Sequence, residues 1–170
     1  GFGTLMEAMS GFAEITGEPD GPPTLPQYPL ADTCAAFYGA LATMFAVYSR
    51  DVVGTGKGQM IDVSIWESLF ATLGPNALVH ALTGVPPKRT GNRTISSAPR
   101  NTYLTKDGLW VALAGSTQST AVRLFNVIGR PEMIDDPRFA TNMERLKNHP
   151  AMDEIIGPWI AGHTRDEVIR

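Results

Sequence analysis

The chain reads Pro29-Leu30-Ala31-Asp32-Thr33-Cys34-Ala35-Ala36 at the start of a long apolar segment. Asp32 is the only acidic residue between positions 21 and 50, and positions 33–48 carry no charged side chain. An aspartate in this place can cap a helix, because its carboxylate accepts hydrogen bonds from the unpaired N–H groups of the first turn. It can also act as a covalent nucleophile, held where backbone donors stabilise an oxyanion. The surrounding residues must decide between these two interpretations.

The residues that follow give Asp32 a context. They read Arg50-Asp51-Val52-Val53-Gly54-Thr55-Gly56-Lys57-Gly58-Gln59 and then Met60-Ile61-Asp62-Val63-Ser64-Ile65-Trp66-Glu67-Ser68. The combined pattern, P-x-x-D, an Ala-rich helix, R, and T-G-K-G-Q-x-I-D-V-S-x-x-E, resembles the class III CoA-transferases of the CaiB/BaiF type. That family includes formyl-CoA and carnitine CoA-transferases and the α-methylacyl-CoA racemases. The resemblance covers nearly the whole chain, continuing through Gly91-Asn92-Arg93, Ala98-Pro99, the stretch from Tyr103 to Gly108, and Asp136-Pro137-Arg138-Phe139.

The resemblance implies a chemical role for Asp32. In the transferases of this family the aspartate at this position attacks the thioester carbonyl of an acyl-CoA, which gives a mixed aspartyl anhydride and a free CoA thiolate. The thiolate then forms an aspartyl-CoA thioester, the first acid leaves, and a second carboxylic acid collects CoA. A carboxylate suits this role because acyl transfer to it roughly preserves the activation of the thioester. The implied enzyme belongs to class EC 2.8.3, with coenzyme A and acyl-CoA as substrates rather than permanently bound cofactors.

An α-methylacyl-CoA racemase or epimerase is the first alternative. The racemases move a proton at the carbon alpha to the thioester, so they use a histidine together with the same aspartate. Phe2 occupies the position that matches this histidine, and a phenylalanine cannot transfer protons. His80, His149 and His163 lie on other segments far downstream. The second alternative is a non-catalytic fragment that binds CoA or contributes to dimerisation.

Two departures from the family pattern concern the acceptor acid. The formyl-CoA:oxalate branch carries a Tyr-Glu pair where this chain has Gly3-Thr4. It also has a glycine-rich loop where this chain reads Thr94-Ile95-Ser96-Ser97. The resemblance therefore implies a small carboxylic acid as partner but argues against naming oxalate.

Composition places the chain among ordinary soluble globular proteins, with 43% hydrophobic and 18% charged residues. A net charge of −3 argues against a nucleic-acid partner. No run of about eighteen apolar residues and no signal peptide is visible, so no membrane span is expected. The single cysteine, Cys34, excludes an intramolecular disulfide and suits a reducing cytoplasm, where we expect the protein to reside.

A basic stretch stands out from an otherwise acidic first half. Lys88, Arg89, Arg93 and Arg100 bring four positive charges within thirteen positions, and no acidic residue lies among them. One interpretation is a solvated linker. The other is a contact to the phosphates of CoA or to a carboxylate substrate, for which Arg93 and Arg100 are the candidate ligands.

Prolines and glycines divide the chain at Gly84-Val85-Pro86-Pro87-Lys88-Arg89-Thr90-Gly91-Asn92. We expect residues 1–84 to be part of a large CoA-transferase domain that carries the catalytic aspartate. Residues 85–98 then form a linker, and residues 99–170 form a small α+β domain that is incomplete at its C-terminus. The first part is predicted to contain, in order, a helix near residues 4–14, a loop over 17–29, a buried helix over 33–49, a strand over 60–65 and a helix over 67–82.

The second part has stronger local signals. Residues 101–104 and 109–114 flank Thr105-Lys106-Asp107-Gly108, which predicts a hairpin because Asp-Gly tolerates positive φ. Apolar residues at helical spacing over 118–128 predict a helix that Gly129 ends. A further apolar face is formed by Met152, Ile155, Ile156, Trp159 and Ile160.

Two other features do not predict a site. Gly54-Thr55-Gly56-Lys57-Gly58-Gln59 lacks the Gly and the Ser or Thr that a phosphate-binding loop requires, so a tight turn is favoured. Asp62 and Glu67 have no Cys or His at ligand spacing, so a metal site is not expected.

The predicted fold class is α/β. Helix, strand and helix follow one another in the first part, which suits one end of a layered domain. The resemblance implies part of a Rossmann-like large domain followed by the small α+β domain, in a fragment from the middle of a longer enzyme. It also implies an interlocked homodimer for the full-length chain.

Overall fold

The chain folds into two compact units, and the computed structural model describes residues 2–170. The first unit ends at Gly91 and the second runs from Asn92 to Arg170. The boundary falls within the stretch from Gly84 to Asn92 that the prolines and glycines single out, and inside the linker expected over residues 85–98.

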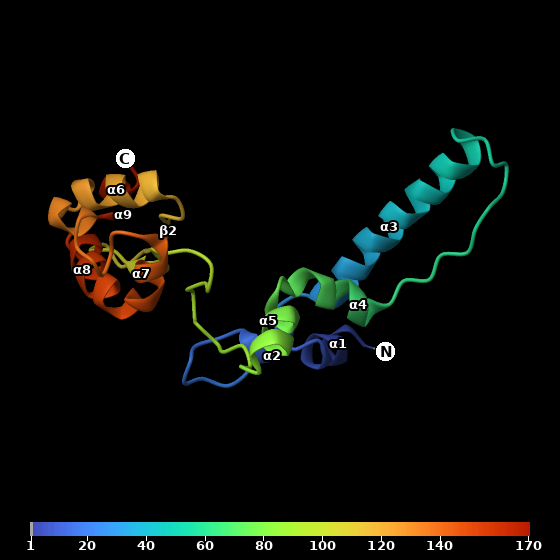
Figure 1. The fold of residues 1–170 in the computed structure, drawn as a ribbon, viewed down its shortest axis with the longest axis horizontal. Coiled ribbons are helices and arrows are strands. Elements are labelled where there is room, and N and C mark those ends of the chain that lie inside the picture. Colours follow the sequence, from blue (N-terminus) through green and yellow to red (C-terminus); the bar gives the residue numbers. More distant parts are fainter. Residues whose placement is uncertain (1) are drawn as a thin grey trace. The chain divides into compact units, whose positions relative to one another are not determined.

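The first unit is helical throughout its regular structure (Figure 1). Its longest element is α3, and α1 packs against both α3 and α4. Figure 1 shows α3 extending away from the short helices, while the chain that follows it returns to α4. The elements are α1 (Gly3–Met9), α2 (Phe12–Ile15), α3 (Leu30–Asp51), α4 (Ile65–Phe70), the 3-10 helix η1 (Ala71–Leu73) and α5 (Asn76–Thr83).

The bounds or type of three predicted elements in this unit need correction. The strand expected over residues 60–65 is wrong, because residues 54–64 form no regular structure. An extended segment becomes a strand only when a neighbour pairs with its backbone, and no strand of this unit lies in the described residues. The helices expected over 4–14 and 67–82 are each interrupted, the first at Gly11 with φ +87° and the second at Gly74 with φ +67°. Gly11 adopts the left-handed helical conformation, whereas Gly74 combines its positive φ with ψ −146°; neither conformation continues a helix.

The helix expected over residues 33–49 is confirmed and is longer, but its predicted burial is wrong. Ala31 is the only buried residue of α3. Its aromatic and aliphatic side chains are exposed in the chain described here, namely Phe37, Tyr38, Leu41, Met44, Phe45 and Tyr48. By length and composition alone α3 could cross a membrane, a criterion that the core helix of a soluble protein also meets. The expectation that no segment reaches this length is therefore corrected.

The second unit confirms the predicted hairpin. Strands β1 (Arg100–Leu104) and β2 (Trp110–Ala114) pair antiparallel, with Arg100 opposite Ala114 and Leu104 opposite Trp110. Gly108 in the connecting turn has φ +74°, which the Asp-Gly signal predicted. Figure 1 shows the helices of this unit gathered around the hairpin. They are α6 (Gln118–Val127), the 3-10 helix η2 (Pro131–Ile134), α7 (Asn142–Lys147), α8 (His149–Ala161) and α9 (Arg165–Val168).

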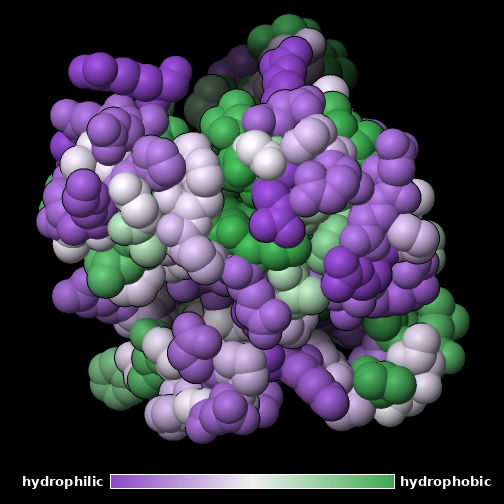
Figure 2. Space-filling view, turned by 90° about the vertical axis from the view of Figure 1, so that its left-hand side faces the viewer, coloured by the Kyte–Doolittle hydropathy of each residue, from purple (hydrophilic) through white to green (hydrophobic). Residues whose placement is uncertain are grey.

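A single hydrophobic core holds the second unit together. Residues from both predicted apolar faces are buried in it, including Ala121 and Phe125 of α6 and Met152, Ile156 and Ile160 of α8. Figure 2, seen from the side of this unit, shows hydrophilic side chains over most of the visible face and apolar side chains in a strip near its centre. The apolar periodicity of the sequence predicted these buried residues correctly, because the apolar faces of α6 and α8 pack into the same core.

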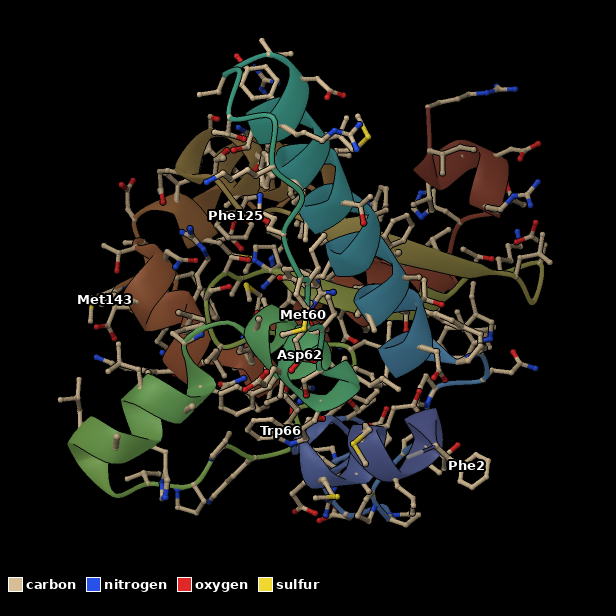
Figure 3. The ribbon with its side chains drawn as sticks, turned by 90° about the vertical axis from the view of Figure 1, so that its right-hand side faces the viewer. Phe2, Met60, Asp62, Trp66, Phe125 and Met143 are labelled. Atoms are coloured by element: carbon tan, nitrogen blue, oxygen red, sulfur yellow. The ribbon has the colours of Figure 1, made fainter. Side chains whose placement is uncertain are left out.

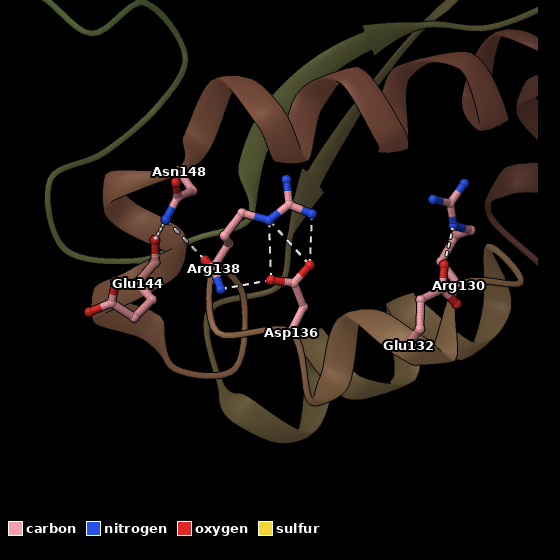
Figure 4. A network of polar contacts seen from close by, with 6 residues as sticks. All are labelled: Arg130, Glu132, Asp136, Arg138, Glu144 and Asn148. Atoms are coloured by element: carbon pink, nitrogen blue, oxygen red, sulfur yellow. Dashed lines mark hydrogen bonds and ion pairs between the residues drawn. The ribbon is translucent and has the colours of Figure 1, made fainter.

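The turn at Asp136-Pro137 is confirmed, and contacts between Asp136 and Arg138 stabilise it (Figure 4). The Asp136 carboxylate accepts hydrogen bonds from the backbone N–H of Arg138 at 2.8 Å and from the Arg138 guanidinium at 2.7 Å. This pairing holds the pKa of Asp136 below its usual range. Phe139, which follows Arg138, is fully buried in the core.

Candidate active site at Asp32

Asp32 lies in the first turn of α3 but does not cap that helix. The helix begins at Leu30, the cap position is Pro29, and no side chain at that position caps it. The Asp32 side chain is exposed, and among residues 2–170 its carboxylate has no hydrogen-bond donor. Among residues 2–170, therefore, no hydrogen bond engages the carboxylate of Asp32, and the capping interpretation is wrong because the cap position is Pro29.

The cap of α3 comes from another helix. Glu7, in α1, is only 2% exposed, and its Oε1 accepts a hydrogen bond from the backbone N–H of Ala31 at 3.3 Å. A carboxylate at the N-terminus of a helix also interacts favourably with the helix dipole. Sequence reasoning missed Glu7. The available signal was a lone acidic residue on a short helix that otherwise carries no charge.

Gly3, the first residue of α1, lies directly against the carboxylate of Asp32. A Cβ atom at this buried glycine would lie 2.8 Å from Asp32 Cγ and would collide with Oδ2. The close approach therefore depends on the missing side chain. The neighbouring Phe2 is 80% exposed and points outward from the start of α1 (Figure 3).

A second group of polar residues lies between α3 and α4. Asp62, Ser64, Glu67 and Ser68 line an open cavity of about 290 Å³ together with Tyr38 of α3. Ser64 caps α4 by accepting a hydrogen bond from the backbone N–H of Glu67 at 3.3 Å. Figure 3 shows Met60 and Asp62 on the segment that leads into α4, with Trp66 at the start of that helix. The part of the chain that the structure describes contains no cluster of His, Cys, Asp and Glu that could hold a metal ion.

Residues of the basic stretch differ in whether they form ion pairs. Arg93 is paired: its Nη2 lies 2.6 Å from Asp153 Oδ2, and Asp153 also accepts hydrogen bonds from Asn101 at 3.0 Å and from the Tyr103 hydroxyl at 2.5 Å. Arg89 forms an ion pair with Glu14 at 3.0 Å.

Arg100 is the contrasting case. It is exposed on β1 and makes no ion pair with any described residue. Arg93 and Arg100 belong to the second unit, whereas Asp32 belongs to the first.

Tyr103 is buried in the hydrophobic core of the second unit, and its hydroxyl is part of the same network. Desolvation raises the pKa of the Tyr103 hydroxyl far above its usual range, and the hydrogen bond to Asp153 raises it further. The phenol is therefore a fixed hydrogen-bond donor to Asp153 rather than a group that titrates. This network was not predicted, because each of the three donors lies 50 or more positions from Asp153 in the sequence.

Known proteins resemble this chain over its whole length. The model of CoA-transferase family III matches residues 1–170. Succinyl-CoA–D-citramalate CoA-transferase of Chloroflexus aurantiacus is 36% identical over 168 residues, which are 99% of this chain and 41% of that protein. Acetyl-CoA:oxalate CoA-transferase of Acetobacter aceti is 36% identical over 89% of this chain and 38% of that protein. The chain thus spans about two fifths of the length of these relatives.

The fold agrees with solved structures. A CaiB/BaiF family protein from Brucella suis is 30% identical, with a TM-score of 0.75 over 99% of this chain and 44% of the other. A structure from Mycobacterium tuberculosis, 21% identical, has the same fold with a TM-score of 0.80 over 99% of this chain and 42% of the other. The sequence pattern around Asp32, the family match and the shared fold lead to one conclusion: this chain belongs to CoA-transferase family III.

Proposed function

We propose that the full-length protein transfers CoA from an acyl-CoA thioester to a free carboxylic acid, with Asp32 as the nucleophile. The observation that carries the proposal is the exposed Asp32 carboxylate, which no donor among residues 2–170 engages while Glu7 caps the helix in its place. A nucleophile must be positioned and yet free to attack, and this arrangement supplies both conditions.

The proposed reaction proceeds by exchange of acyl groups at one carboxylate. An Asp32 oxygen adds to the thioester carbonyl, and the C–S bond breaks to release CoA thiolate and leave a mixed anhydride. The thiolate attacks the Asp32 carbonyl of this anhydride, so the donor acid leaves as its carboxylate and an aspartyl-CoA thioester remains. The acceptor carboxylate repeats the two steps in reverse order, which produces the new acyl-CoA and restores Asp32. No redox partner is needed at any step.

The relatives guide the choice of substrates to test. Their names specify succinyl-CoA or acetyl-CoA as donor and D-citramalate, L-malate, oxalate or glutarate as acceptor. We therefore propose succinyl-CoA as the first donor and a dicarboxylic acid as the acceptor. The acceptor acids to be tested include oxalate. The sequence predicts that oxalate is a poor acceptor, and this assay tests that prediction.

Arg100 is the stronger of the two proposed CoA contacts. It is exposed and makes no ion pair with a described residue, whereas the Arg93 guanidinium is engaged by Asp153. A cation that already neutralises a partly buried carboxylate has less charge available for a phosphate. We propose that Arg100 contacts a CoA phosphate and that the role of Arg93 is to hold the second unit together.

The wider architecture is part of the same proposal. Residues 1–84 would belong to a Rossmann-like large domain, residues 85–98 to a linker and residues 99–170 to a small α+β domain. The full-length chain would form an interlocked homodimer in the cytoplasm. The exposed apolar side chains of α3 support this view, since such a surface is buried in soluble assemblies.

The decisive experiment traps the activated aspartate. The full-length protein is incubated with succinyl-CoA, treated with hydroxylamine and digested with trypsin. Residues 2–49 contain no Lys or Arg, so Asp32 lies in one peptide that ends at Arg50, and the other acids of that peptide serve as internal controls. We expect a hydroxamate on Asp32 alone and none in the Asp32→Asn variant. Exchange of the alpha proton with solvent and no adduct would instead assign the protein to the racemase branch.

A further inference from the structure

We propose that Gly3 and Glu7 are positioning residues for Asp32, acting from one face of α1. The proposal rests on the nucleophilic role of Asp32. Glu7 does not contact the Asp32 carboxylate, and Gly3 borders that carboxylate with its backbone only. Glu7 fixes the backbone next to Asp32 through its hydrogen bond to the N–H of Ala31. Gly3, which has no side chain, leaves room for the Asp32 carboxylate.

The two residues are placed to act together. They are four positions apart in α1, so they lie on the same side of that helix. Both are buried, and Ala31, which precedes Asp32, is 0% exposed. Asp32 itself is exposed. Buried residues thus contact the start of α3, where the exposed side chain of Asp32 lies.

Glu7 acts through the backbone. Its Oε1 accepts the N–H of Ala31 at 3.3 Å from a site that is 2% exposed, so water does not readily replace this acceptor. Without it the first turn of α3 would have an unpaired N–H beside Asp32, and helix ends without caps fray. A glutamine could still accept the same hydrogen bond through its amide oxygen.

Gly3 acts through space. A Cβ atom here would lie 2.8 Å from Asp32 Cγ and 3.3 Å from Oδ1, and would overlap Oδ2. The atoms in its way are the free end of a side chain that can rotate. An alanine would therefore displace the carboxylate without breaking the packing of α1 on α3. Alanine also favours a helix more than glycine does, so the fold should not suffer.

This contrast separates positioning from stability. A displacement of about 1 Å at a reacting group can lower the rate by about 100-fold. We therefore expect Gly3→Ala to lower kcat by about 10- to 100-fold while the melting temperature stays the same or rises and KM for acyl-CoA changes little. A residue with a merely structural role would give the opposite pattern.

The experiment compares variants of the full-length protein. Gly3→Ala, Glu7→Ala and Glu7→Gln test the proposal. Gly58→Ala is the matched control for the glycine, because a Cβ at Gly58 meets no atom within 4 Å and its backbone has no positive φ. Glu154→Gln, at an exposed position of α8, is the control for the glutamate. For each we measure kcat, KM, melting temperature, hydroxamate yield at Asp32 and hydrogen exchange over residues 30–33.

The expected result has three parts. Gly3→Ala and Glu7→Ala lose kcat by about 10- to 100-fold, whereas Glu7→Gln stays within about threefold of wild type. Hydrogen exchange at the start of α3 accelerates in Glu7→Ala alone. Both controls behave as wild type. Rescue by glutamine identifies the accepting oxygen as the feature that matters.

Other outcomes overturn different claims. If the wild type transfers CoA and both alanine variants match the controls in kcat, the positioning role is wrong while the nucleophile stands. Loss in only one alanine variant removes the other residue from the proposal. If the wild type shows neither transfer nor a hydroxamate on Asp32, the transferase function itself is wrong and the positioning role falls with it.

Discussion

Glu7 caps α3 from a neighbouring helix: its buried Oε1 accepts the backbone N–H of Ala31 at 3.3 Å across 24 positions of sequence. An acidic residue that caps a helix from a distance leaves the acidic residue of the first turn without a structural task. Asp32 is that residue, and its carboxylate receives no hydrogen bond from residues 2–170. The two acids at the start of α3 therefore differ in their contacts, since Glu7 accepts a backbone hydrogen bond and Asp32 accepts none from residues 2–170.

This separation predicts a ranking of stabilities. Glu7→Ala should lower the free energy of unfolding by about 1–2 kcal/mol, because it removes a cap and leaves a buried N–H unpaired. Asp32→Ala should lower it by about 0.5 kcal/mol at most, since only an exposed interaction with the helix dipole is lost. Urea unfolding of the full-length variants measures both values. The reverse order would mean that Asp32 is the cap.

The second prediction concerns Gly91 and the carboxylate of Glu18. Gly91 has φ +61°, and a Cβ there would lie 2.7 Å from Glu18 Oε2 and 3.0 Å from Oε1. Its backbone N–H also donates to the carbonyl oxygen of Gly17 at 2.9 Å, which ties the end of the first unit to its Pro/Gly loop. Gly91→Ala should therefore destabilise the protein by about 1–3 kcal/mol, through backbone strain and through the contact with Glu18.

A glycine elsewhere in the first unit separates these two effects. Gly54 has φ +81° with no atom within 4 Å of the position of a Cβ, so Gly54→Ala reports backbone strain alone. Gly91→Ala should cost more than Gly54→Ala, and adding Glu18→Ala should return part of the difference. A double-mutant cycle in urea measures this coupling. Equal costs at the two glycines would show that Glu18 does not restrict Gly91.

The third prediction tests the network around Asp153. Tyr103→Phe removes the 2.5 Å hydrogen bond to Asp153, whereas the donors from Arg93 and Asn101 remain. We expect a loss of about 1.5–3 kcal/mol, the range for a hydrogen bond to a charged group. Hydrogen exchange over residues 100–104 and 149–161 should accelerate in the variant. An unchanged unfolding midpoint would mean that the remaining donors satisfy Asp153 fully.

The fourth prediction is a pH dependence that arises from His149. Burial lowers the pKa of His149, and nearby Arg93 lowers it further, although Asp153 acts in the opposite direction. Because the folded state disfavours the protonated ring, the unfolded state binds more protons once the pH falls below the ordinary histidine value of about 6.5. The contribution of His149 to stability is therefore complete above about pH 6.5 and decreases as the pH falls below it.

Thermal unfolding between about pH 7.5 and about pH 5.5 checks this sign, since the range spans about one unit on each side of the ordinary histidine pKa. His149→Leu should show a shallower fall in melting temperature over that range than the wild type. His80→Leu, which removes an exposed histidine from α5, is the control. A wild-type slope in His149→Leu would show that other groups determine the acid sensitivity.

Local signals predicted the second unit well. The Asp107-Gly108 turn, the helix ended by Gly129 and the Asp136-Pro137 turn were all confirmed, because each depends on residues within a few positions of one another. The apolar faces of α6 and α8 were also predicted, since both are buried in the same core. The Tyr103–Asp153 network was not predicted, because spacing in sequence does not reveal which polar groups share a buried site.

In the first unit the sequence by itself determined the family pattern and the helix that begins near Asp32, and it singled out that residue as the candidate nucleophile. It wrongly predicted a strand over 60–65, which would need a paired neighbour, and a buried α3, which would need a covering surface. The tertiary structure alone decided that Glu7 is the cap and that Gly3 makes room for Asp32. The physical reason is that a hydrogen bond and a steric contact depend on distance in space, and α1 meets α3 only after the intervening loop has folded back.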